Sequence, residues 1–194
     1  MEAFSDGVIA IIITIMVLEL KPPHSTEPAA LVPLLPIFGS YVLSFMMVGI
    51  YWNNHHHLLQ AATCVTGRVL WANLHLLFWL SLIPFTTAWV GENRFAAFPV
   101  AVYGVVLLFA GLAYYFLCRA LIAYHGSDSR LAIALGKDRK GKLSQVLYLV
   151  GIPIAFWSPT FAYGLYIAVA IMWLVPDRRI EQLLEQEECE PVKK

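Results

Sequence analysis

Polar and ionisable residues stand directly beside long apolar runs in this sequence. The first group, Phe4-Ser5-Asp6, precedes an apolar stretch from Gly7 to Leu18 in which Thr14 is the single polar residue. A carboxylate this close to hydrocarbon is costly unless it reaches the interface or finds partners. Asp6 therefore predicts partner side chains on neighbouring helices.

Candidate partners follow in two later groups, Trp52 to His57 and Asn73 to His75. If successive apolar segments alternate in direction, all three groups lie at a similar depth near the inner membrane surface. Consecutive helical residues point about 100° apart, so His55, His56 and His57 cannot all face Asp6. We predict a hydrogen-bonded cluster that holds the first helix against the second and third, with Asp6 accepting from His or Asn donors. Its members are Phe4, Ser5, Asp6, Trp52, Asn53, His56, His57, Asn73 and His75.

The histidine run leaves two other interpretations open, a proton-sensitive gate and a metal site. Three adjacent histidines do not form a tetrahedral face, and no Cys cluster or His-Glu-x-x-His motif accompanies them. Pairing polar groups within hydrocarbon contributes roughly 1 kcal/mol each, enough to hold helices in register. We therefore favour the structural cluster and predict no metal and no cofactor.

Composition indicates a membrane protein. The chain has 194 residues, of which 59% are hydrophobic and 13% charged, with a mean hydropathy of +0.68. This is too apolar for a soluble globular domain. The formal net charge of zero suggests no nucleic-acid partner. The first stretch lacks a basic leader and a small-residue cleavage site, so we expect it to be retained.

Six segments approach the length of about 20 apolar residues that a spanning helix needs. They cover residues 4–20, 32–60, 68–91, 95–124, 143–158 and 160–176. We therefore predict an all-α polytopic membrane protein, with six transmembrane helices in residues 1–176 and a charged cytoplasmic tail in residues 177–194. A re-entrant pair remains an alternative for the last two segments, and a small oligomer contact remains one for the tail.

The distribution of Lys and Arg predicts the orientation. With both termini cytoplasmic, eleven of these residues fall on the inner side and only Lys21 and Arg94 on the outer side. This agrees with the positive-inside rule. The three cysteines, Cys64, Cys118 and Cys189, have no metal-ligand spacing and suggest no disulfide framework.

One stripe of the first segment carries branched aliphatic side chains. At 3.6 residues per turn, Val8, Ile11, Ile15 and Leu18 share a face, with Thr14 at its edge. A helix that is apolar on all sides does not indicate which face meets which neighbour. The sequence alone therefore favours ordinary packing or lipid contact for this stripe.

Phe4-Ser5-Asp6 followed by Gly7-Val8-Ile9-Ala10-Ile11, together with Trp52, Asn53 and the histidine run, resembles the endosomal and lysosomal potassium channel family, in particular its prokaryotic members. That family lacks the Thr-Val-Gly-Tyr-Gly filter, as does this chain. Its signature is Arg-x-x-x-Phe-Ser-Asp, and the Arg would fall one residue before Met1. We expect the start of the chain to have been set too late, or the chain to have been trimmed. The resemblance covers the first helix closely and the six-helix layout loosely.

The resemblance implies a potassium-permeable cation channel in a prokaryotic plasma membrane. It also implies a homotetramer in the lipid bilayer, in which the first helices of the subunits surround a conduit for potassium ions. Ile11 takes the position of the main constriction and Thr14 lies one turn outward, where its hydroxyl can touch an ion. Ile15 and Leu18 continue the apolar wall. Such a constriction gates by dewetting, and we expect a modest preference for potassium.

Glu19 lies near the expected outer mouth, where it either concentrates cations or extends to the membrane interface. Two other classes of protein stay open as alternatives. A membrane-embedded His-dependent enzyme needs several separated histidine boxes, whereas three of the six histidines here form one tripeptide. A small transporter predicts internal repeats with broken helices, and no convincing repeat is visible.

Overall fold

The computed structural model describes residues 1–62, 64–125 and 138–174, and within these ranges all regular structure is helical. This confirms the predicted all-α class. The α-helices are α1 (Glu2–Met16), α2 (Leu35–Gln60), α3 (Gly67–Ser81), α4 (Ile83–Glu92), α5 (Ala97–His125), α7 (Arg139–Ile154) and α8 (Pro159–Leu174). Two 3₁₀ helices, η1 (Val17–Glu19) and η2 (Pro28–Leu34), follow α1 and precede α2. The predicted tail, residues 177–194, lies outside the described residues.

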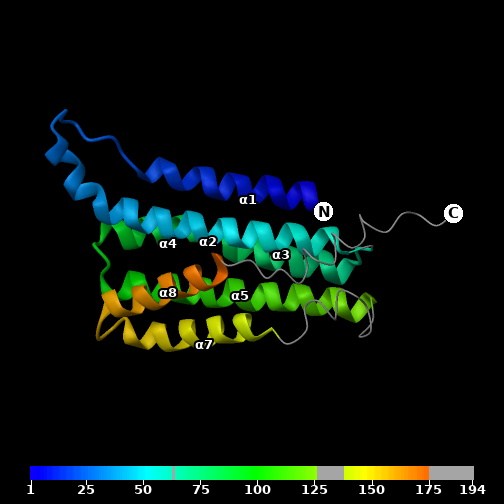
Figure 1. Ribbon diagram of the computed structural model, residues 1–194. Helices are drawn as coiled ribbons and strands as arrows, with labels where there is room; N and C mark the ends of the chain where they lie inside the picture. Colours follow the sequence, from blue (N-terminus) through cyan, green and yellow to red (C-terminus); the bar gives the residue numbers. More distant parts are fainter. Residues whose placement is uncertain (63, 126–137, 175–194) are drawn as a thin grey trace.

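The helices form an elongated bundle with α1 at one edge and α7 at the opposite edge (Figure 1). α1 packs against α2, α3 and α4. α5 packs against α3, α4, α7 and α8 and therefore occupies the middle of the bundle. One face of α1 is consequently covered by three neighbouring helices, while its other face points away from the bundle.

Prolines set several of the helix boundaries. α1 and η1 end before Pro22 and Pro23, which cannot continue a helix. The sequence predicts one helix over residues 68–91, whereas the structure divides this stretch into α3 and α4 at Leu82. Pro84 explains the break, because its ring has no N–H to donate and collides with the carbonyl of the preceding turn.

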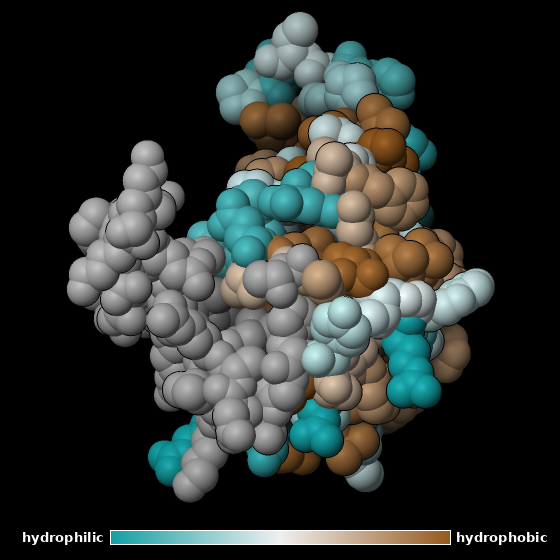
Figure 2. Space-filling model, turned by 90° about the vertical axis from the view of Figure 1, so that its right-hand side faces the viewer, coloured by the Kyte–Doolittle hydropathy of each residue, from teal (hydrophilic) through white to brown (hydrophobic). Residues whose placement is uncertain are grey.

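Three helical stretches are long and apolar enough to cross a membrane: Pro28–Gln60, Gly67–Glu92 and Ala97–Tyr124. Pro159–Leu174 is a shorter apolar helix of 16 residues. The number of six crossings, the cytoplasmic termini and the domain boundary at residue 176 remain predictions. The beginnings of α1 and α3 and the ends of α2 and α5 lie at the same end of the bundle (Figure 1). Seen from this end, hydrophilic side chains lie among hydrophobic ones (Figure 2).

Close helix packing in the second half of the chain depends on two glycines. The Tyr166 side chain of α8 is fully buried and contacts the helices that carry Gly104 and Gly151. A Cβ atom at Gly104 would overlap the Tyr166 hydroxyl, and one at Gly151 would meet the edge of the same ring. Absence of a side chain at these positions lets α5 and α7 approach α8 closely.

Gly104→Ala should therefore lower the free energy of unfolding by about 1–3 kcal/mol, the usual effect of overpacking a filled core. Thermal unfolding of the purified protein in detergent measures this change. Gly164→Ala on α8 is the matched control, because a Cβ there meets nothing within 4 Å. Equal melting temperatures for the two variants would contradict the packing argument.

Candidate functional site

A buried hydrogen-bond network joins α1, α2 and α3. Asn73 Nδ2 donates to Ser5 Oγ at 2.9 Å, and Asn73 Oδ1 lies 2.7 Å from His55 Nε2. Ser5 and His55 are fully buried, and Asn73 is 2% exposed. A single amide of α3 thus contacts the first helix with its nitrogen and the second helix with its oxygen.

This arrangement determines the tautomer of His55. The amide oxygen of Asn73 can only accept, so His55 Nε2 carries the hydrogen and donates it. The other ring nitrogen, Nδ1, is buried and has no hydrogen-bond partner among the described residues. A neutral imidazole with its hydrogen on Nε2 satisfies these contacts, because its unprotonated Nδ1 need not donate.

A direct hydrogen bond between α1 and α2 lies beside the buried network. Trp52 Nε1 donates to Asp6 Oδ1 at 3.0 Å. The donor to Asp6 is therefore an indole, in place of the His or Asn side chain that the sequence predicts. The expected linkage of Asp6 to a neighbouring helix is present, with Trp52 as the α2 residue that provides it.

The structure changes the membership of the predicted cluster. His55, which the predicted set omits, is the histidine of the network. His75 is exposed on α3, where its Nε2 accepts from Trp79 Nε1 at 3.0 Å. Phe4 is 59% exposed. Asn53 and His57 are half-buried and lie outside the network formed by the described residues.

The helical periodicity of α2 identifies His55 as the histidine that faces the bundle. The buried residues of α2 include Ser44, Met47 and Val48, then His55, Leu58 and Leu59. His55 stands seven residues after Val48 and eleven after Ser44, so it belongs to the inward stripe. His56 and His57 are rotated away from this stripe by one and two helical steps.

The aliphatic stripe of α1 points away from the bundle. Ile11 is 58% exposed, Ile15 44% and Leu18 72%, while Ile9, Ile12 and Met16 on the opposite face are buried. The predicted wall residues therefore share one face that the rest of the described chain leaves uncovered.

Thr14 is exposed on the same side of α1. Its hydroxyl lies 3.0 Å from the carbonyl oxygens of both Ala10 and Ile11, to which it donates. A hydroxyl that donates to its own helix still has lone pairs on its oxygen. The oxygen can therefore accept a water molecule or a cation from outside the helix.

A groove of about 700 Å³ runs between α1 and α4. The exposed aliphatic residues Ile11 and Ile15 line it, and Phe85 and Trp89 line the opposite wall. Glu19 and Glu92 also contribute to its lining. Of the predicted pore-lining residues, Ile11 and Ile15 border this groove together with Glu19, and Glu19 and Glu92 are its acidic residues.

Comparisons with known proteins identify a family of channels. The family model of the endosomal/lysosomal potassium channel TMEM175 matches residues 1–84. A potassium channel of Chryseobacterium sp. (strain P1-3) is 52% identical over 186 residues, which are 96% of this chain and 97% of that protein. The endosomal/lysosomal proton channel TMEM175 of Danio rerio is 25% identical over 129 residues, 64% of this chain but 24% of that protein.

A solved structure has a similar fold. The crystal structure of a lysosomal potassium-selective channel TMEM175 homolog from Chamaesiphon minutus superimposes with a TM-score of 0.77 at 28% identity. The match covers 91% of this chain and 95% of that one. Fold and relatives together define a helical membrane protein of an ion-channel class. The chain belongs to the endosomal/lysosomal potassium channel TMEM175 family, which confirms the resemblance seen in the sequence.

Proposed function

We propose that this protein is a potassium-permeable cation channel of a prokaryotic plasma membrane, assembled as a homotetramer with α1 of each copy lining a central conduit. The observation that carries the proposal is the exposed stripe of Ile11, Ile15 and Leu18 on α1, in a chain whose relatives are named potassium channels. One α1 cannot enclose a conduit. Several copies around a common axis supply the missing walls.

The two faces of α1 have complementary roles in this proposal. Its inner face is fixed to α2 and α3 through Ser5 and Asp6, so the helix moves only together with its neighbours. Its outer face presents large branched side chains to the axis. A ring of isoleucines cannot replace the water around an ion, so the closed conduit is dry and ions pass when the ring widens.

Selectivity in this proposal comes from few polar groups. Thr14 lies one turn outward from Ile11, and its hydroxyl oxygen faces away from the bundle. An oxygen ring at this level favours the ion that sheds its water more easily, which is potassium. Glu19 lines the surface beyond it and attracts cations by its negative charge.

Reconstitution in liposomes tests the proposal. The protein should pass potassium in preference to sodium, and Thr14→Val should lower the ratio of the two fluxes about two- to tenfold, which is up to about 1.4 kcal/mol of differential interaction. Thr160→Val, at an exposed position on α8, is the matched control and should leave the ratio unchanged. Absence of potassium flux in the unmodified protein would refute the channel function.

A further inference from the structure

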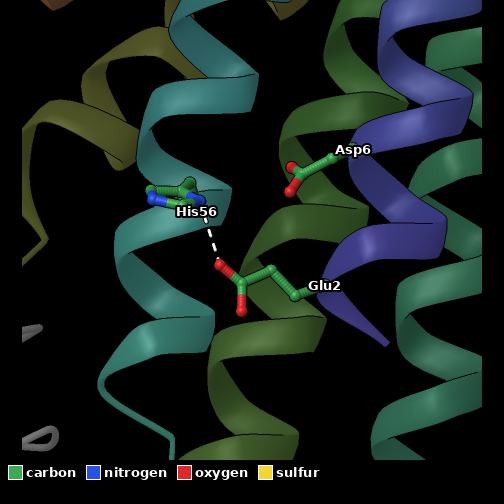
Figure 3. A group of neighbouring side chains, drawn as sticks. All are labelled: Glu2, Asp6 and His56. Atoms are coloured by element: carbon green, nitrogen blue, oxygen red, sulfur yellow. Dashed lines mark ion pairs between the residues drawn. The ribbon is translucent and has the colours of Figure 1, made fainter.

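A group of three metal-ligating side chains lies where α1 and α2 meet, outside the buried network. Glu2 and Asp6 are one helical turn apart on α1, and His56 comes from α2. Figure 3 shows both carboxylates directed toward the side of α2 that carries the imidazole. Each residue offers one ligand atom, and the three atoms lie within 4.8 Å of one another. We propose that these residues bind a divalent transition-metal ion such as Zn²⁺.

The donor set suits such an ion. Zinc binds imidazole nitrogen and carboxylate oxygen at about 2.0–2.2 Å, and open sites use three protein ligands with water in the fourth position. Two ligands at these bond lengths in a tetrahedron are about 3.3 Å apart. His56 Nδ1 and Glu2 Oε1 are 3.1 Å apart, close to that separation. Asp6 supplies the third ligand with a small movement of its side chain.

The contact between His56 and Glu2 leaves the imidazole nitrogen available. Although Glu2 Oε1 is near, His56 Nδ1 is shielded from solvent and has no aligned hydrogen-bond partner among the described residues. A neutral imidazole with an unused nitrogen lone pair is the form that ligates a metal. The His56 side chain is 29% exposed and that of Glu2 42%, so an ion can reach the group from the aqueous side.

Trp52 contacts two of the proposed ligands, Asp6 and His56. Its indole nitrogen donates to Asp6 Oδ1 at 3.0 Å, which leaves Oδ2 for the ion. Its ring stacks on the imidazole of His56, with 5.7 Å between ring centroids and 26° between planes. Outer contacts of this kind orient metal ligands in established sites. One residue thus holds a ligand from each of the two helices.

The proposed site uses other residues than a metal site built from the histidine run. Three adjacent histidines do not share a helix face, whereas one histidine and two acids from another helix do converge here. A bound ion would link the inner end of α1 to α2 in addition to the contacts of Ser5 and Asp6. It would therefore restrain the helix that carries Ile11.

Titration of the purified full chain in detergent with zinc alone tests the proposal. Calorimetry should show one zinc ion per chain, and Glu2→Gln and His56→Gln should each weaken its binding at least about tenfold, because each removes a ligand. His24→Gln, in the exposed segment between η1 and η2, is the control and should bind zinc as the unmodified protein does. When Co²⁺ is added in place of Zn²⁺, absorption bands of the bound metal in the visible range should appear with the unmodified protein and be absent in Glu2→Gln and His56→Gln.

Lack of zinc binding, or equal affinity in Glu2→Gln and the unmodified protein, would overturn the proposal and leave an ordinary ion pair. If His56→Gln does not fold, the zinc affinity of Glu2→Gln decides between the two outcomes. Glu2 is partly exposed at the start of α1, so this substitution should not prevent folding. Binding is measured without ion flux. A protein that binds zinc but passes no potassium would therefore refute the channel function and leave the metal site intact.

Discussion

Ile11→Asn should raise the potassium flux of the reconstituted protein about tenfold or more. Ile11 is 58% exposed on the face of α1 that the proposal turns toward the conduit. An amide at the narrowest level binds water, so the constriction stays wet without widening. A tenfold rise corresponds to about 1.4 kcal/mol removed from the barrier to permeation. Potassium efflux from liposomes of equal protein content measures the effect.

Ile171→Asn provides the matched control. Ile171 lies on α8 and is also 58% exposed, so the same substitution places the same amide on an apolar surface away from α1. Its flux should equal that of the unmodified protein. Equal fluxes for Ile11→Asn and Ile171→Asn would show that the exposed stripe of α1 faces lipid or another protein surface instead of the conduit.

The helical layout could be read from the sequence because long apolar runs and prolines mark it directly. The main difference is the break at Leu82, which splits the predicted helix 68–91 into α3 and α4. Pro84 lies inside that apolar run, and hydropathy takes no account of the hydrogen bond that a proline removes. α8 has 16 residues, fewer than the roughly 20 that a full crossing needs, so its composition and length do not by themselves define a crossing.

The buried face of α1 is indicated by one polar residue and not by the pattern of apolar residues. Its aliphatic residues occur on all sides, so apolar periodicity does not distinguish the face that packs from the face that is exposed. Ser5 does distinguish them, because a hydroxyl within an apolar helix needs a partner. Ile9, Ile12 and Met16 follow Ser5 at intervals of four, seven and eleven residues, and all four are buried. The stripe through Ile11 and Leu18 is therefore the one left outside.

The cluster was harder to predict because its contacts join residues far apart in the chain. Residues that share a depth in a bundle can meet only if they also face one another, and depth does not define rotation about a helix axis. His55 lies on the buried stripe of α2 and therefore faces the cluster. His75 lies on the exposed side of α3 and therefore points away from it. Trp52 combines an aromatic ring with an indole N–H, and this N–H donates to Asp6, a role that the place of the residue in the sequence does not indicate.

His55→Leu should lower the free energy of unfolding by about 1–2 kcal/mol, because it leaves Asn73 Oδ1 buried without its donor. Unfolding by sodium dodecyl sulfate in mixed micelles measures the change. His75→Leu is the matched control: the same substitution removes one hydrogen bond on the exposed side of α3, and we expect less than about 0.5 kcal/mol.

A double-mutant cycle separates the hydrogen bond from the loss of packing. In His55→Leu combined with Asn73→Leu, no polar atom of that pair remains unsatisfied, so the combined loss should be smaller than the sum by about 0.5–1.5 kcal/mol. Ser5 loses its donor in both variants that lack Asn73, and its contribution therefore cancels in the cycle. Strictly additive losses would show that the contact of His55 with Asn73 does not stabilise the protein, and that α2 and α3 are held together at this level by apolar packing.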